Sequence, residues 1–578
     1  MVDANVFFKP DFAVVVAKMH FAVYREGARM YTVIQREGGG IGQIEALGAV
    51  PKGQECYGLL GIATLQSTKC LIVVSEASFI GTLKEAKIFR VEKCDFLPFT
   101  SPLSPTDTHQ IALLRHIINS KSFYFSYTYD LTHSLQRIST FSDLQKSQHS
   151  VLRADPRFFW NLHMAQDLIT NGAFDPVLIL ISGFVQSECA QFEGHEVEYT
   201  LISRRDRRRA GVRFHTRGLD AEGNSANFVE TEQIVLVHQN SKFVAASFVQ
   251  VRGSIPLRWH QKPNLKWAPQ GVVSGSTQEN LKSAEKHFTE AISCYGEISL
   301  INLIDKTGNQ AVLGSALQTL IQSLKHPKVH LTWFDFHHEC RALHWENLSH
   351  LVREVDSSLG QYGFFECSLD ANADWGEEVI ISLQGGVFRT NCMDCLDRTN
   401  VVQSVFARNI LHRQLYALGI AGRPSGEAFQ PFPEPLEFCF RSFWANNADV
   451  ISYLYAGTGA LKVDFTRTGK RTKLGALEDG QNSIQRYFIN NFYDGGRKNA
   501  IDAFLGHLNP RSPPYRHFPL LRLLLILALG LALAHTAGKA TGQSWTAYFL
   551  GLGLGCLMLQ KVLAVNGRSL VDRPVLDT

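Results

Sequence analysis

The sequence Arg389-Thr390-Asn391-Cys392-Met393-Asp394-Cys395-Leu396-Asp397-Arg398-Thr399-Asn400 places a thiol and a guanidinium in the pattern Cys-x5-Arg. Before it, β-branched and aromatic residues at 379–383 and 387–388 predict strands, separated by the pair Gly385-Gly386. After it, apolar residues recur at helical spacing from 402 to 415. The region is therefore predicted to form a strand, a loop and a helix.

A loop that enters a helix N-terminus directs backbone N–H groups and the positive end of the helix dipole at one point, which suits a phosphate group and a thiolate. We expect Cys392 to be the nucleophile and Arg398 to hold two phosphoryl oxygens through its planar fork. Either Asp394 or Asp397 is expected to be the general acid, and Asp397 is favoured because it adjoins the arginine. The same carboxylate, once ionised, would activate the water that cleaves a phosphocysteine. This chemistry belongs to cysteine phosphatases, and it requires no metal and no cofactor.

The pair Cys392 and Cys395 is open to a second interpretation, as a redox-active or zinc-binding Cys-x-x-Cys. The sequence holds no second Cys-x-x-Cys, and the cluster His337-His338-Glu339-Cys340 lacks the spacing of zinc motifs. We interpret those histidines as structural residues or as secondary lining of the pocket. Within a phosphatase loop, Cys395 would be able to trap an oxidised Cys392 as a disulfide.

The whole chain has the composition of a folded protein. Its 578 residues are 45% hydrophobic and 19% charged, which allows two or three globular units. The formal net charge of +4 is small for this length, so a nucleic-acid partner is not indicated. Eleven scattered cysteines and the absence of a signal peptide from the first residues predict a reducing, cytosolic environment.

Two apolar stretches near the C-terminus, 518–537 and 545–565, each have the length of a transmembrane helix. A buried core helix is the alternative for either one alone, but two in succession predict a membrane hairpin. Basic residues flank the pair on both sides, which predicts that both flanks are cytosolic, including a cytoplasmic tail at 566–578. The catalytic part would then face the cytosolic leaflet.

The remaining chain is predicted to contain three parts. Residues 1–180 alternate short β-rich runs with turns and predict a β-rich N-terminal domain. Residues 181–460 alternate strands and helices and predict an α/β catalytic domain. The segment 461–517 is predicted to be a basic juxtamembrane linker. It either attracts anionic lipids or is an ordinary solvated linker, and an extended linker would let the catalytic domain reach its own membrane or an apposed one.

Seven arginines occur in the fourteen residues from 204 to 217. Such a run alone is typical of a solvated face or a nuclear-localisation-like patch. Beside a phosphatase loop and a membrane anchor, we interpret it as a surface that captures polyanionic head groups. The residues expected to bind substrate there are Arg204, Arg205, Arg207, Arg208 and Arg217.

Several blocks of this sequence resemble the Sac family of phosphoinositide phosphatases, and most closely its membrane-anchored members. The resemblance covers essentially the whole chain, hairpin included. The matching blocks are Arg204–Gln233, Arg252–Pro256, Phe334–His337, Arg389–Asn400, Tyr455–Lys462 and Asp464–Arg471.

The resemblance implies a metal-independent phosphatase that acts on phosphatidylinositol 4-phosphate, and less selectively on the 3-phosphate and the 3,5-bisphosphate, at endoplasmic reticulum and Golgi membranes. It implies the nucleophile role for Cys392 and the phosphate-binding role for Arg398. It admits membrane-contact-site or Golgi trafficking proteins as partners. The further residues expected to contact substrate are Asn391, Met393, Cys395, Leu396, Thr399 and Lys462.

One departure from the family pattern leaves room for an alternative function. Asn446 stands where the family commonly has Asp. If that acid assists catalysis, the chain would be a catalytically weak phosphoinositide sensor or scaffold with the same fold. A protein-tyrosine phosphatase or a soluble inositol-phosphate phosphatase would share the thiolate chemistry, but the predicted hairpin and the arginine run disfavour both.

Overall fold

The computed structural model describes residues 12–16, 20–25, 30–45, 53–239, 241–341, 344–370, 373, 375, 377–469, 472–510 and 570–576. Within these ranges, no helix is long and apolar enough to cross a membrane. The predicted spans at 518–537 and 545–565 lie outside the described residues, so the hairpin stays a prediction.

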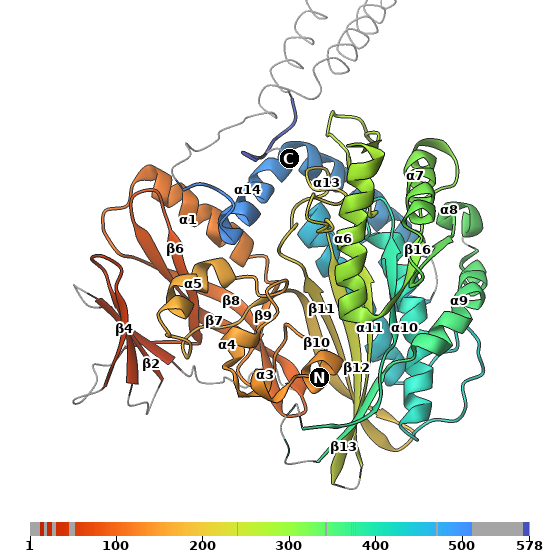
Figure 1. Cartoon of the computed structure of the whole chain (residues 1–578), viewed down its shortest axis with the longest axis horizontal. Coiled ribbons are helices and arrows are strands. Elements are labelled where there is room, and N and C mark those ends of the chain that lie inside the picture. Colours follow the sequence, from red (N-terminus) through yellow and green to blue (C-terminus); the bar gives the residue numbers. More distant parts are fainter. Residues whose placement is uncertain are drawn as a thin grey trace, which may run out of the picture.

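The N-terminal region is rich in β-structure, as its sequence predicts (Figure 1). It begins with an antiparallel sheet in the order β4-β3-β2-β1-β5, followed by longer strands and short helices. Helix α1 starts at a capping box, in which Ser104 and Asp107 each accept a hydrogen bond from the other's backbone N–H. The elements are β1 (Phe12–Val16), β2 (His20–Arg25), β3 (Met30–Gln35), β4 (Ile41–Glu45), β5 (Gln54–Cys56), β6 (Gly58–Thr64), β7 (Lys69–Leu83), β8 (Ala86–Pro98), α1 (Pro105–Ile118), β9 (Phe123–Ser126), α2 (Leu135–Ser139), α3 (Asp143–Ser147), α4 (Ser150–Arg153) and α5 (Leu162–Thr170).

One mixed sheet of 13 strands joins this region to the catalytic region. Its main path runs β17-β16-β20-β13-β12-β11-β10-β9-β8-β7-β6. Because β10 pairs with β9 on one side and with β11 on the other, the boundary predicted near residue 180 divides the sequence but not the sheet. The strands of the second region are β10 (Ile181–Phe192), β11 (His195–Arg205), β12 (Val229–Gln239), β13 (Lys242–Arg252), β14 (Trp259–His260), β15 (Val272–Val273), β16 (Glu297–Asn302), β17 (Val329–Trp333), β18 (Phe365–Asp370), β19 (Val379–Ser382) and β20 (Gly386–Asn391).

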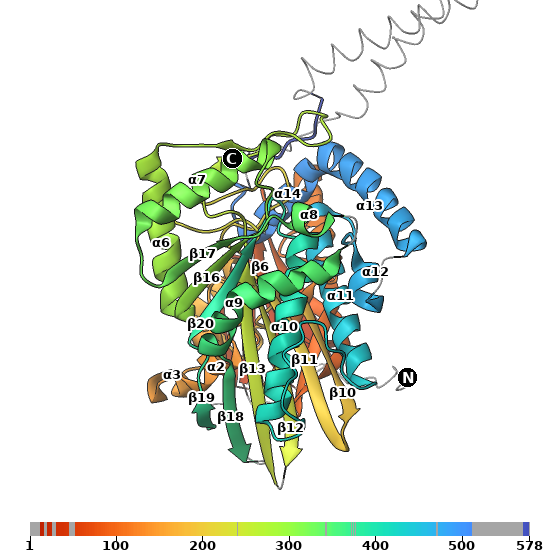
Figure 2. The same cartoon turned by 90° about the vertical axis from the view of Figure 1, so that its right-hand side faces the viewer.

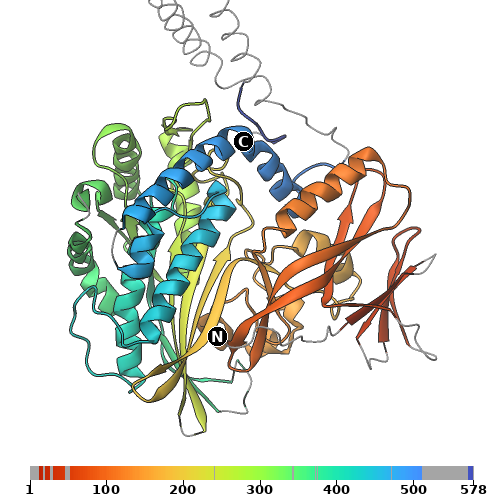
Figure 3. The same ribbon diagram turned by 180° about the vertical axis from the view of Figure 1, so that it is seen from behind.

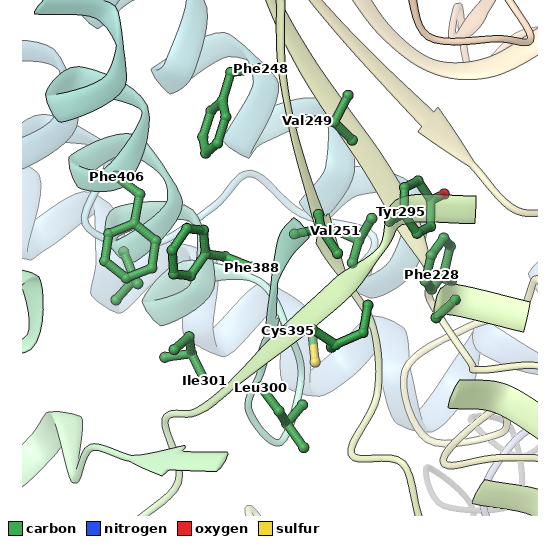
Figure 4. Packing of buried hydrophobic residues seen from close by; sticks show 14 of the residues in the cluster. Phe228, Phe248, Val249, Val251, Tyr295, Leu300, Ile301, Phe388, Cys395 and Phe406 are labelled. Carbon is green, nitrogen blue, oxygen red and sulfur yellow. The ribbon is translucent and has the colours of Figure 1, made fainter. Parts of the chain in front are cut away.

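Strand β20 lies at the centre of the catalytic region. It runs parallel to β16 on one side and to the end of β13 on the other, and all six of its residues are buried. Phe388 of β20 packs on Phe406 of α10 (Asp397–Ala417), with ring centroids 5.0 Å apart (Figure 4). The carboxyl ends of β13, β16 and β20 therefore meet at one edge, where open α/β sheets bind their ligands.

Helices cover the catalytic part of the sheet in separate layers (Figure 2). Helix α10 contributes to two hydrophobic clusters: Phe406 packs with residues of β16 and β20, whereas Leu411 packs with residues of β11 and α11. In the second cluster Phe443 of α11 lies 5.3 Å from Tyr199 of β11. The other elements of these layers are α6 (Thr277–Tyr295), α7 (Gly308–Leu324), α8 (Phe336–Glu339), the 3-10 helix η2 (Trp345–Asn347), α9 (Leu348–Tyr362) and α11 (Leu436–Ala456).

The segment predicted as a linker, 461–517, is folded over most of its length, and this corrects the prediction. It forms α12 (Val463–Thr468), α13 (Lys473–Phe492) and α14 (Asp494–Leu505), which pack on the body (Figures 1 and 3). Phe504 of α14 stacks on Phe123 of β9 at 5.0 Å. Its basic residues are partly neutralised: Arg486 pairs with Asp397, 89 positions away, and two others pair with acids of α14 itself.

Candidate active site

The predicted strand, loop and helix are confirmed around the sequence Cys392-Met393-Asp394-Cys395-Leu396. Strand β20 ends at Asn391 and helix α10 begins at Asp397. The turn between them holds Cys395 in the left-handed region, at φ 54°, which folds the loop back over the thiol of Cys392. The loop therefore lies at the carboxyl edge of the sheet and at a helix N-terminus.

The thiol of Cys392 is 2% exposed and surrounded by donors. Its Sγ accepts a hydrogen bond from the N–H of Cys395 at 2.9 Å and one from Oγ1 of Thr399 at 3.6 Å. Burial raises the pKa of Cys392, but hydrogen bonding from Cys395 and the positive charge of Arg398 lower it to about 5. Cys392 is therefore a thiolate at neutral pH.

Cys395 carries the opposite protonation state. Its Sγ donates to the carbonyl of Gly253 at 2.9 Å and lies 3.1 Å from the carbonyl of Cys392. Burial and the neighbouring thiolate raise the pKa of Cys395 well above its usual value. Cys395 is thus a neutral donor that supports the loop, and Figure 4 shows its side chain among the labelled residues of the core.

Arg398 lies in the first turn of α10 and lines the same pocket as Cys392. Its guanidinium donates to the carbonyl of Leu303 at 3.0 Å and to Oε1 of Gln310 at 3.3 Å, and it lies 3.4 Å from Oδ1 of Asp305. Asp305 also bonds Nδ1 of His337 at 2.8 Å. The segment after β16 therefore holds the arginine beside the thiolate.

Asp394 is bound by two arginines. Arg213 contacts its two carboxylate oxygens at 3.0 and 2.7 Å, and Arg217 contacts it at 2.7 Å. Burial raises the pKa of Asp394, but the two guanidinium groups overcome this and hold it well below its usual range. A carboxylate held in this way does not carry a proton at neutral pH, so Asp394 anchors the loop and is not the general acid.

Asp397 also lines the pocket, but it has other partners. Its Oδ1 accepts from the N–H of Leu461 at 2.6 Å, and its Oδ2 lies 3.2 Å from Arg486. Of the two candidate acids, the geometry favours Asp397. Its role in proton transfer stays a prediction.

The arginine run is divided between two places. Arg213 and Arg217 reach the catalytic loop, whereas Arg204 is fully buried and pairs with Glu230 at 3.0 Å and Glu232 at 2.7 Å. The structure thus assigns Arg204 to the interior of the sheet and not to the head-group surface that the sequence predicted.

The other three predicted arginines also lie outside the pocket around Cys392. Arg205 is buried, donates to the carbonyl of Gly211 and lies over the ring of Trp160. Arg207 donates to the carbonyl of Pro156. Arg208 pairs with Asp206 and Glu290 at 2.7 and 2.9 Å. Each of these three side chains is therefore bound to other groups of the protein.

The predicted loop residues differ in where they point. Thr399 lies beside the thiolate, and the carbonyl of Met393 accepts a hydrogen bond from Arg217 at 2.6 Å. The side chain of Asn391 donates to Asn302 within the core, and Leu396 packs in a buried cluster with residues of α11. A substrate would meet Asn391 and Leu396 through their backbone only.

The pocket above Cys392 has a volume of about 230 Å³. Lys462, which is expected to contact substrate, lines it, with its ammonium group 5.4 Å from the ring centre of Phe336 and 5.7 Å from that of Trp345. His337 also lines it, as one interpretation of its sequence proposed. The lining residues that the sequence did not reveal are Arg213, Phe214, Trp267, Leu461, Ser483, Arg486 and Tyr487.

Asn446 lies apart from this site. Its side-chain amide donates to Gln186 at 3.0 Å and accepts from Arg467 at 3.1 Å, and it does not line the pocket. The substitution that left room for an inactive sensor therefore does not touch Cys392 or Arg398.

Comparison with known proteins places the chain in a family. Residues 57–341 match the SacI homology domain. The phosphatidylinositol-3-phosphatase SAC1-A of Danio rerio is 36% identical over 539 residues, which cover 90% of this chain and 89% of the relative. The phosphatidylinositol-3-phosphatase SAC1 of Saccharomyces cerevisiae is 35% identical, with 90% and 85% covered, and an uncharacterized protein of Schizosaccharomyces pombe is 40% identical, with 82% and 79% covered. The chain therefore belongs to the Sac family of phosphoinositide phosphatases.

Proposed function

We propose that this protein is a membrane-anchored phosphatase that converts phosphatidylinositol 4-phosphate to phosphatidylinositol. The 3-phosphate, and less selectively the 3,5-bisphosphate, are proposed as further substrates. The observation that carries this proposal is the pairing of a buried Cys392 thiolate with Arg398 in one pocket at the start of α10. The names of the relatives support the lipid class.

The reaction would proceed in two displacements at phosphorus. The Cys392 thiolate attacks, a sulfur–phosphorus bond forms and the ester bond to the inositol oxygen breaks. Arg398 and Lys462 stabilise the charge on the phosphoryl oxygens. Water then attacks the phosphocysteine, which releases inorganic phosphate and restores the thiolate.

Asp397 is proposed to move the proton in both steps. Its carboxylate accepts from the N–H of Leu461 and lies 3.2 Å from Arg486, in the wall of the pocket that holds Cys392. In the first step, protonated Asp397 would donate its proton to the inositol oxygen as that oxygen leaves. The carboxylate that remains would activate water in the second step.

The anchor is proposed to be the hairpin of spans 518–537 and 545–565, in endoplasmic reticulum and Golgi membranes with the catalytic body in the cytosol. The apolar runs and their basic flanks support this orientation.

The decisive test is phosphate release from vesicles that each carry one phosphatidylinositol monophosphate, in the presence of a chelator, with the whole chain and its Cys392→Ser variant. We expect cysteine-dependent release that is highest on the 4-phosphate. The absence of release from every lipid, with vesicle binding intact, would refute the enzymatic proposal in favour of a sensor.

A further inference from the structure

Helix α13 presents two chemically different faces. One face forms part of the pocket wall through Ser483, Arg486 and Tyr487. A second face, which adjoins the first at Tyr487 and Phe488, exposes four large apolar side chains to solvent. They are Leu474, Leu477, Ile484 and Phe488, with exposures of 66, 70, 56 and 49%.

These four positions lie on one side of the helix, because α-helical geometry advances about 100° per residue. Single exposed apolar residues are common, but a stripe with four of them on one side of one helix marks a surface that binds something. Within the described part of the chain, no element covers this face. The stripe is therefore available to an external partner.

A neighbouring loop extends the apolar face around the mouth of the pocket. Trp267 is 62% exposed and stacks on Tyr487, with ring centroids 5.4 Å apart and planes at 13°. The hydroxyl of Tyr487 donates to the carbonyl of Leu265 at 2.8 Å, which ties this loop to α13. Lys262 and Lys266 are exposed on the same loop. We call the four residues of α13 together with Trp267 the α13 rim.

The composition of the α13 rim matches a lipid surface. Helices that lie in a membrane interface bury an apolar face among the acyl chains, and tryptophan is enriched at that depth. Lysines beside such a face attract anionic head groups. A protein partner would also accept the apolar side chains, but the position at the mouth of a pocket proposed to take a lipid head group, with two lysines beside it, favours an anionic bilayer.

The course of the described chain would bring the predicted hairpin to the same side. Before the predicted spans the described chain reaches Pro510, whose carbonyl accepts from Gln110 at 2.7 Å, and after them it continues from Leu570. In this returning segment the N–H of Asp572 donates to the carbonyl of Asn491 at 2.7 Å. Figures 1 and 2 show these residues at the end of the molecule where α13 and α14 lie. The residues that flank the two predicted spans in the sequence therefore lie at this end.

We infer that the α13 rim inserts shallowly into an anionic bilayer and so presents the Cys392 pocket to the head group of a lipid substrate. This inference rests on the proposed function, because it explains how that pocket would receive a lipid. It adds a second contact with the membrane, independent of the predicted hairpin.

The test compares two substrates and two sets of variants in the full-length chain. The rim variant carries Leu474→Gln, Leu477→Gln and Ile484→Gln, because glutamine keeps the helix propensity of leucine. The control carries Leu144→Gln, Leu152→Gln and Leu383→Gln, at apolar positions that are also exposed, by 71, 51 and 55%, on other elements. Each protein is assayed on a water-soluble dioctanoyl phosphatidylinositol 4-phosphate and, after reconstitution, on the long-chain lipid in the same vesicle.

We expect the rim variant to hydrolyse the soluble substrate within about twofold of the unaltered protein and to lose at least tenfold on the vesicle lipid. The control is expected to keep both rates. Equal rates for the rim variant and the unaltered protein on vesicles would overturn the inference. An equal loss on both substrates would also overturn it, because it would mean that the substitutions disturb the pocket itself.

Two further measurements separate the rim from other causes. Brominated lipids quench tryptophan at short range, and we expect part of this quenching to disappear in Trp267→Phe. Light scattering that shows self-association lost in the rim variant would instead identify a second copy of the chain as the occupant. If the unaltered protein hydrolyses neither substrate, the proposed function fails, whereas the quenching still reports whether the rim enters the bilayer.

Discussion

The ionisation of Cys392 can be measured directly by the rate at which iodoacetamide alkylates it across a range of pH. Only the thiolate reacts, so the rate follows the ionised fraction. With a pKa of about 5, in place of the usual 9.0, about 99% of molecules carry the thiolate at pH 7, compared with about 1% for an unperturbed thiol. The peptide that contains Cys392 is quantified by mass spectrometry.

We expect the alkylation rate of Cys392 to rise to a plateau with a midpoint near pH 5. In Arg398→Gln the midpoint should move upward by about one unit or more, because the variant removes a positive charge that favours the thiolate. Cys189 is an internal control, because its side chain is exposed to the reagent. Partial desolvation and the nearby charges of Glu198 and Glu196 raise the pKa of Cys189 to about 11. A Cys392 midpoint near 9, or one that Arg398→Gln leaves in place, would refute the assignment of an activated nucleophile.

The same shift links Cys392 to stability, with a definite sign. A group whose pKa is lowered in the folded state contributes stability above its unfolded pKa and loses it as the pH falls through the folded value. For a folded pKa of about 5, the contribution at pH 7 is about 3 kcal/mol. The unfolding free energy of the unaltered protein should therefore fall more steeply from pH 7 to 5 than that of Cys392→Ser.

Three further predictions concern the carboxylates of Asp394 and Asp397 in the catalytic loop and of Asp572 beside α14. Asp394→Asn should lower the free energy of unfolding in urea by about 3 kcal/mol, because Arg217 is then buried without its counter-ion; a change below about 1 kcal/mol would contradict the anchoring role. Asp397→Asn should slow turnover by about a hundredfold or more and let a radiolabelled phosphocysteine accumulate after acid quench, whereas slow turnover without that intermediate would remove Asp397 from the second step. Asp572→Ala should lower the unfolding free energy by about 1 kcal/mol, measured by thermal melting, because its carboxylate accepts from the N–H of Gly496 at the start of α14.

The sequence predicted the parts of the site that are local in the chain. The strand, the loop and the helix around Cys392 lie within one continuous stretch, so periodicity and motif spacing were sufficient. The groups that orient the loop come from far away: Arg213 and Asp394 are 181 positions apart, and Asp397 and Arg486 are 89 apart. No pattern within one sequence encodes such pairings, because they depend on how the sheet and its helices pack.

The arginine run was also misjudged, because its ion-pair partners depend on strand pairing that the sequence does not reveal. The positive charge of the residues from 204 onward is evident in the sequence, but the acidic partners that neutralise it are not. Arg204 lies directly across from Glu230 on the adjacent strand β12, a register that only the sheet defines. Only Arg204 and Arg205 of the run belong to β11, and both are buried, so a run of charged residues that begins at the end of a strand is poor evidence for a surface.

Because residues 463–505 are folded, the catalytic domain can reach only membranes close to its predicted anchor. An extended linker over 461–517 would have let the catalytic domain move far from its anchor. In the structure the described body continues to residue 510, so seven residues, 511–517, separate it from the predicted span. Seven extended residues cover at most about 23 Å. Because the segment 570–576 also docks on the body, the second flank of the predicted hairpin is held as closely as the first. If the hairpin forms as predicted, both tethers keep the α13 rim next to the membrane that holds the anchor, so the fold itself favours substrate in that membrane over substrate in a distant one.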